Sequence, residues 1–114
     1  MNRTPDFLLN DILEAIERIE SFSKGLSQEG FFEDELKQSA IIRQLEIIGE
    51  AVKSLPKDFT AKHPNIPWRE IAGARDILIH AYFGVDLSRI WKVAEEDLPE
   101  LKKEIKKAIG KNGK

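Results

Sequence analysis

Apolar side chains recur at the three- and four-residue spacing of amphipathic helices along most of the chain. The first stripe begins after Thr4-Pro5-Asp6, which supplies an N-cap, a proline at the first helical position and an early acid. It predicts a helix that runs to about Leu26. Gly25 and Gly30 then frame a break in the pattern.

A second long stripe predicts a helix that ends before Pro56, because the residue before a proline disfavours helical backbone. Its apolar members are Leu36, Ile41, Leu45, Ile48, Val52 and Leu55. Phe31 and Phe32 stand at the entry to this helix. They are expected either to cover the end of the core or to belong to a short separate turn.

Three prolines between residues 55 and 68 exclude a continuous helix and predict a connector with at most a short turn. His63 lies in this connector without a second histidine or a carboxylate cluster nearby, and it is expected to be a loop residue outside any site. Pro67 then starts a third helix that ends near Phe83-Gly84, with glycine as the C-cap.

Asp86 is expected to cap a fourth helix. Asp97 and Pro99 mark either a kink or a fresh start that leads on to Ile109. No segment shows the alternation of a strand, and most links are short. The pattern therefore predicts an all-α fold, a four- to five-helix antiparallel bundle.

Composition narrows the class of protein. A chain of 114 residues is long enough for one domain only, so residues 1–114 are expected to form a single domain, with 110–114 as a flexible basic tail. No apolar run approaches the roughly 18 residues that cross a bilayer, and the N-terminus lacks the pattern of a secretory signal, so we expect a cytoplasmic protein without a membrane contact. Without cysteine, only His63 and His80 offer non-carboxylate ligands, and neither a metal nor a cofactor is expected.

The charge is unevenly distributed. The net charge of −2 argues against a domain that coats nucleic acid by bulk electrostatics. Residues 100–114, however, hold six lysines against two glutamates, which leaves this stretch at +4 and the rest of the chain at −6. The favoured interpretation is a solvated helix end whose lysines complement the helix dipole. The alternative is an auxiliary phosphate contact.

The candidate chemistry lies near the end of the third helix. At about 100° per residue, Arg75 and Tyr82 share one stripe two turns apart, and Asp76 is one turn from His80, where its carboxylate can orient the imidazole. Arg75 and His80 differ by about 140° and cannot both face one small group from a regular helix. Either the helix end distorts, or two chains of a homodimer share the site, which we favour.

These residue types suit RNA cleavage without a metal, in which the 2′-hydroxyl attacks the adjacent phosphorus and leaves a cyclic phosphate. Histidine can exchange a proton near neutral pH, and an arginine can hold the phosphate as charge develops. Arg75, His80 and Tyr82 could equally make structural hydrogen bonds, and spacing alone does not separate the two.

Arg75, His80 and Tyr82 form the pattern R-x4-H-x-Y, which resembles the signature of the HepT-like branch of HEPN proteins. The resemblance extends over about residues 4–109, including 43–51 and the stretch from His63-Pro64 to Asp97-Leu98-Pro99. It implies a homodimeric helical ribonuclease, the toxin of a type VII-like toxin–antitoxin pair. Its partners would be RNA and a minimal nucleotidyltransferase antitoxin.

The same resemblance assigns roles to individual residues. It implies that Arg75 and His80 are catalytic, that Asp76 supports them, and that the antitoxin transfers AMP onto Tyr82, the only tyrosine. A phosphate beside Arg75 would neutralise its charge and occupy space that RNA needs. Two alternatives remain: a non-catalytic HEPN dimer that binds the nucleotidyltransferase or RNA, and a structural bundle whose polar helix end closes a dimer.

Overall fold

The computed structural model describes residues 5–73 and 86–112, and these residues are helical with short links and no strand. The long helices are α1 (Pro5–Ser23), α3 (Glu35–Ser54) and α7 (Leu98–Asn112). The short elements are α2 (Gln28–Glu33), α4 (Lys57–Ala61), a helical stretch at 68–73, α6 (Leu87–Lys92) and the π-helical segment η1 (Val93–Asp97). The predicted all-α fold is confirmed.

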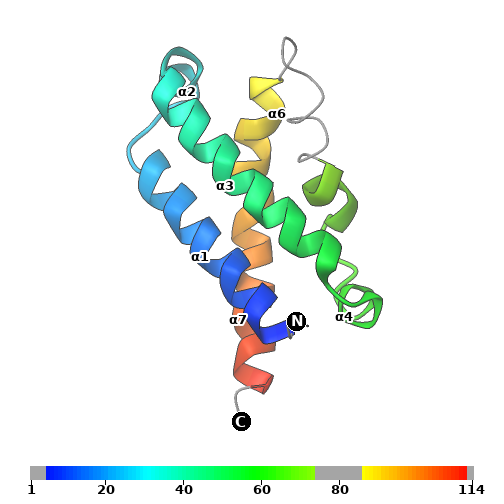
Figure 1. Ribbon diagram of the computed structural model, residues 1–114. Helices are drawn as coiled ribbons and strands as arrows, with labels where there is room; N and C mark the ends of the chain where they lie inside the picture. Colours follow the sequence, from blue (N-terminus) through cyan, green and yellow to red (C-terminus); the bar gives the residue numbers. More distant parts are fainter. Residues whose placement is uncertain (1–4, 74–85, 113–114) are drawn as a thin grey trace.

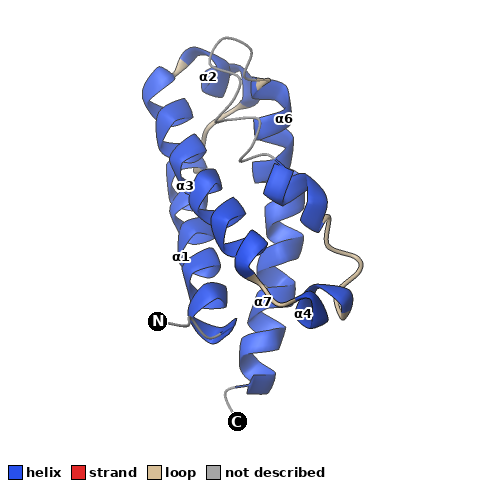
Figure 2. Ribbon diagram, turned by 45° about the vertical axis from the view of Figure 1, so that its right-hand side comes forward, coloured by secondary structure: helices blue, strands red, loops and turns tan. Residues whose placement is uncertain are grey.

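The long helices pack side by side along the molecule (Figures 1 and 2). Helix α1 runs opposite to α3, and α6, η1 and α7 form a column that also runs opposite to α1. Helix α1 packs against both α3 and α7. The predicted antiparallel arrangement therefore holds for these pairs. None of the described helices combines the length and apolar character that a bilayer crossing requires.

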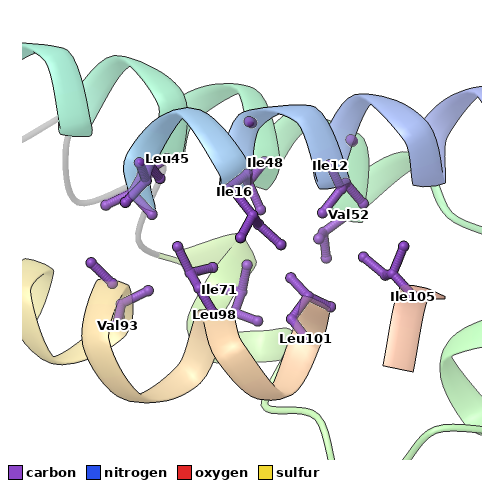
Figure 3. Packing of buried hydrophobic residues seen from close by; sticks show 14 of the residues in the cluster. Ile12, Ile16, Leu45, Ile48, Val52, Ile71, Val93, Leu98, Leu101 and Ile105 are labelled. Atoms are coloured by element: carbon purple, nitrogen blue, oxygen red, sulfur yellow. The ribbon is translucent and has the colours of Figure 1, made fainter. Parts of the chain in front are cut away.

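The core lies where the apolar stripes of α1, α3 and α7 meet (Figure 3). Its fully buried side chains include Ile12, Ile16, Leu45, Ile48, Ile71, Leu98, Leu101 and Ile105. No polar or charged residue of the described parts is buried as a whole. Burial of apolar surface at about 25 cal/mol per Å² therefore provides the main stabilisation of the bundle.

The break after the first helix comes slightly earlier than the apolar pattern predicted. Helix α1 ends at Ser23 rather than near Leu26, and the chain turns through Gly25, whose φ of 74° lies in the left-handed region that glycine adopts without strain. The Ser23 hydroxyl donates to the carbonyl oxygen of Ile19 at 2.8 Å. A serine hydroxyl that donates to a carbonyl oxygen one turn earlier slightly destabilises a helix at that point.

Phe31 and Phe32 belong to the separate helix α2, and they have opposite environments. Phe31 is fully buried, whereas Phe32 remains 40% exposed. Asp34 separates α2 from α3, since it ends α2 and its carboxylate accepts a hydrogen bond from the Lys37 N–H at 3.0 Å as the N-cap of α3. Both sequence alternatives are thus partly right: a separate turn exists, and one of its phenylalanines closes the core.

The region around Asp97 is neither a sharp kink nor a new helix. The backbone remains helical from Leu87 to Asn112, and the π-helical residues Val93–Asp97 join α6 to α7. Pro99 lies just after the π-helical turn, inside this continuous helical stretch, where its missing N–H removes one intrahelical hydrogen bond. A π-helical turn inserts an extra residue, and such turns are frequent at functional sites.

Candidate functional site

The residues that carry the predicted chemistry lie outside the described residues. Arg75, Asp76, His80 and Tyr82 all fall between 74 and 85, so the predicted catalytic pair, its support and the AMP acceptor stay predictions. The structure describes both flanks of this segment. The stretch 68–73 leads into it, and α6 follows it.

The incoming flank is anchored to the connector by an indole. The Trp68 Nε1–H donates to the carbonyl oxygens of Thr60 at 3.1 Å and His63 at 2.9 Å. Its ring also meets Phe59 edge-on, with ring centroids 6.0 Å apart. Ile71, one turn further along, is buried in the core. This partly buried indole, with its N–H satisfied, fixes both the position and the rotation of the helical stretch 68–73.

The outgoing flank begins with a cap that the sequence predicted. The Asp86 carboxylate accepts a hydrogen bond from the Arg89 N–H at 3.3 Å, which confirms Asp86 as the N-cap of α6. Ile90 is buried, and the Trp91 ring packs on Phe31 with centroids 5.3 Å apart. Helix α6 is therefore held on the end of the core that α2 closes.

A hollow of about 360 Å³ lies between the two flanks. Its lining comes from Glu70 on the incoming stretch and from Asp86, Ser88, Arg89, Lys92 and Val93 around α6. Arg89 and Lys92 can donate to phosphate oxygens, and Ser88 adds a hydroxyl. Glu70 and Asp86 balance their charge, so this hollow has donors for an anion without a net positive charge.

Asp97 is a partly buried carboxylate that the sequence did not single out as a site residue. Its Oδ2 is shielded from solvent and has no hydrogen-bond partner. Burial raises the pKa of Asp97 above its ordinary value; Lys92 lowers it, and the carboxylates of Glu70 and Glu96 raise it further. A signal was present, because Asp97 directly precedes the buried Leu98 within an apolar stripe.

His63 lies in the connector, as predicted, but its side chain is engaged. The Nδ1 atom lies 3.2 Å from Oε1 of Glu104 on α7, and the two side chains are only 17% and 13% exposed. The His63 ring packs on Phe59 at a centroid distance of 4.6 Å. The hydrogen bond from His63 is the main reason that the pKa of Glu104 is lowered, and Lys107 and Asn65 lower it further. His63 thus ties the connector to α7.

Among residues 5–73 and 86–112, no group of three or more histidines and carboxylates is arranged to hold a metal ion. The carboxylates near the flanks serve other roles: Asp86 caps α6, and Glu104 binds His63. The described flanks therefore present cationic donors, a hydroxyl and one partly buried acid as their polar chemistry.

Comparison with known proteins shows the family to which this chain belongs. The Ribonuclease HepT-like family matches residues 12–108, a range that includes both flanks and the segment between them. The chain is 53% identical over 107 residues to a protein of Thermococcus cleftensis named "Probable ribonuclease HepT", covering 94% of this chain and 97% of the relative. No solved structure matches the chain.

Two further relatives are also named as putative ribonucleases. A "Putative RNase" of Caldanaerobacter subterraneus is 48% identical over 109 residues, which cover 96% of this chain and 97% of that protein. A "Gamma-glutamylcyclotransferase and putative RNase" of Methanocaldococcus jannaschii is 50% identical over 109 residues, and the chain spans about half of it, 49%. The family match and these identities confirm the predicted family resemblance, and the chain belongs to the HepT-like ribonuclease family.

Proposed function

We propose that the protein is a metal-independent endoribonuclease whose reaction is carried by Arg75 and His80. The observation that supports this most is the family match over residues 12–108, which contains the complete Arg75, His80 and Tyr82 pattern. The relatives that cover nearly the same length are named as ribonucleases. The anchored flanks on either side provide a rigid support for a reactive segment.

In the proposed reaction, His80 removes the proton from a ribose 2′-hydroxyl. The 2′-oxygen then forms a bond to the adjacent phosphorus, and the bond from phosphorus to the 5′-oxygen of the next nucleotide breaks. That leaving oxygen takes up a proton, so the products are a 2′,3′-cyclic phosphate and a 5′-hydroxyl. Arg75 stabilises the negative charge that develops on the phosphoryl oxygens, and Asp76 orients the His80 imidazole.

The proposed site is composite and lies at the interface of a homodimer. The support for this is the register predicted from the sequence, in which Arg75 and His80 would point about 140° apart on one regular helix, and a site shared between two chains is favoured over a distorted helix end. Two copies of the segment related by a two-fold axis would let Arg75 of one chain act with His80 of its partner.

The direct test is cleavage of RNA by purified, unmodified protein in EDTA. We expect cleavage to continue with the metal chelated, and the fragments to carry cyclic phosphate ends. A control sample in which the RNA has 2′-O-methyl groups should stay intact, because the nucleophile is blocked. If unmodified protein leaves RNA intact with and without added magnesium, the chain is a binding module instead, such as a non-catalytic HEPN dimer.

We further propose that the protein is a toxin of a type VII-like pair, inactivated at Tyr82 by a nucleotidyltransferase antitoxin. The Tyr82 oxygen would attack the α-phosphorus of ATP, lose its proton and release pyrophosphate, leaving AMP on the ring. The added phosphate would pair with Arg75 and exclude RNA. The register supports this, since Tyr82 and Arg75 share a helical stripe.

The intact mass after co-expression with a minimal nucleotidyltransferase tests this regulation. We expect a gain of one or more adenylyl units on the wild type and none on Tyr82→Phe, because Tyr82 is the only tyrosine. Tyr82→Phe should also remain active in the presence of the antitoxin. No gain in mass on the wild type, or the same gain on both proteins, would contradict AMP transfer to Tyr82, while leaving the nuclease reaction open to its own test.

A further inference from the structure

The solvent side of α7 carries a face of lysines that the structure leaves exposed. Lys103, Lys106 and Lys107 all point outward, and the Lys107 side chain is 58% exposed. At about 100° per residue, Lys106 and Lys107 lie about 60° and 40° to either side of Lys103, so the three span about 100° of the helix and form one face. We call this the lysine face. Lys111 follows Lys107 four residues later in the sequence.

Lys102 does not belong to this face. Its Nζ atom lies 2.7 Å from the Glu20 carboxylate of α1, and this hydrogen bond raises the pKa of Lys102 above its ordinary value. Lys102 thus joins α7 to α1, and its charge is neutralised within the fold. The contrast shows that only some of the lysines on α7 have a structural use.

The acid nearest to the lysine face is already engaged. Glu104 turns toward the connector, where it binds His63 and is 13% exposed; only its second oxygen reaches Lys107, at 3.6 Å. From residue 100 onward the sequence holds six lysines against Glu100 and Glu104, and of these lysines Lys102 is paired with Glu20. The solvent side of α7 therefore retains an excess of positive charge.

Complementing the helix dipole does not account for these lysines. Such stabilisation is confined to about the last turn of a helix. Helix α7 continues to Asn112, so Lys103 and Lys106 lie nine and six residues before its end. A solvated helix end would need no lysine at either position.

A protein partner also fits this face poorly. Protein interfaces are depleted in lysine and are centred on apolar or aromatic anchors. The large apolar side chains that the described residues expose are Phe7, Phe32 and Leu36, none of them on α7. Lysines without an apolar anchor suit the phosphate backbone of a nucleic acid, which is bound through charge and without regard to sequence.

The lysine face belongs to the same helical column as α6, the helix that follows the candidate catalytic segment in the sequence. The column of α6, η1 and α7 starts directly after Asp86 and extends down the molecule (Figure 1). At about 1.5 Å per residue, Lys106 lies roughly 29 Å along this column from Leu87. A strand stacked at the duplex spacing of about 3.4 Å per phosphate would need roughly eight nucleotides to cover that length.

We infer that the lysine face of α7 is a second RNA contact, which holds the phosphate backbone of the substrate several nucleotides away from the cleavage position. The inference rests on the proposed ribonuclease function for the identity of the nucleic acid. It predicts that RNA length, in addition to local sequence, determines how tightly a substrate binds.

The test compares the affinity of two RNAs for wild type and for Lys103→Gln/Lys106→Gln. Both RNAs are single-stranded and 2′-O-methylated, so they cannot be cut; one has about 20 nucleotides and the other about four, too short to span the column. We expect the variant to bind the long RNA more weakly and the short RNA equally well. For the long RNA, the slope of log K against log salt should become shallower by about 0.7 per lost phosphate contact.

A matched control removes two charges at the opposite end of the molecule, Lys24→Gln/Lys37→Gln. Both double variants should keep the melting temperature of the wild type, and the control should keep its RNA affinity and salt slope. Equal weakening by the two pairs would overturn the inference, as would no binding of long RNA by wild type or an unchanged affinity of the α7 pair. Weakened long-RNA binding in a protein that cuts no RNA would support the contact and reject the nuclease.

Discussion

Replacing His80 by alanine is expected to lower the rate of RNA cleavage by a factor of about 10²–10⁴. This is the range that a positioned general acid or base contributes to a reaction. The loss should appear in kcat, because the imidazole acts on protons that move in the transition state and contributes little to holding the RNA backbone. Cleavage rates of wild type and His80→Ala on one RNA in EDTA measure the effect.

The chain offers a matched control, since its other histidine is His63. His63 is bound to Glu104 and packed on Phe59, so its replacement by alanine should lower stability and leave the cleavage rate per folded molecule near that of wild type. An equal loss of rate in His63→Ala and His80→Ala, with both proteins folded, would contradict the assignment of His80.

Mixing two inactive variants tests whether the site is shared between chains. Arg75→Ala and His80→Ala should each be inactive alone. In a mixed dimer with a composite site, one site combines Arg75 from one chain with His80 from its partner. A freely exchanging equal mixture should then regain about a quarter of wild-type activity. No recovery after demonstrated subunit exchange would place both residues of a site in one chain.

Replacing Phe31 by alanine is expected to lower the free energy of unfolding by about 3–5 kcal/mol. Phe31 is fully buried, and its ring lies 5.3 Å from that of Trp91 and 6.2 Å from that of Phe32. Its removal leaves a cavity where α2 closes the core against α6, and neighbouring side chains cannot fill it without shifting α6. Urea denaturation of both proteins measures the change.

The neighbouring phenylalanine is the control for this prediction. Phe32 is 40% exposed, so Phe32→Ala should cost less than about 1 kcal/mol. Because α6 follows directly after the candidate catalytic segment, Phe31→Ala should also reduce RNA cleavage at temperatures where the protein stays folded. Equal stability losses for the two alanine variants would show that α2 does not close the core as described.

The sequence by itself predicted the helical class and much of the local structure. Apolar spacing placed the long helices, Asp86 was identified as an N-cap, and Gly25 and Gly30 marked the break after the first helix, although α1 ends at Ser23 and not near Leu26. These features depend on residues a few positions apart, where side-chain chemistry and backbone preference act directly. The candidate reactive residues were likewise identified from a short motif, and their assignment rests on the sequence and the family match.

Tertiary packing decided the features that depend on distant residues. Nothing near Phe31 and Phe32 indicates which is buried, because their environments are set by Trp91, about sixty residues later. His63 and Glu104 are 41 positions apart, and only the packing of the connector on α7 brings them together.

The same distinction applies to the basic end of the chain. Sequence alone left its lysines as one charged stretch with two possible uses. The packing of α7 against α1 pairs Lys102 with Glu20 and leaves Lys103 and Lys106 in solvent. The helical repeat determines which residues share a face. Whether that face is covered depends on the neighbouring helices, and only an uncovered face leaves its lysines available to RNA.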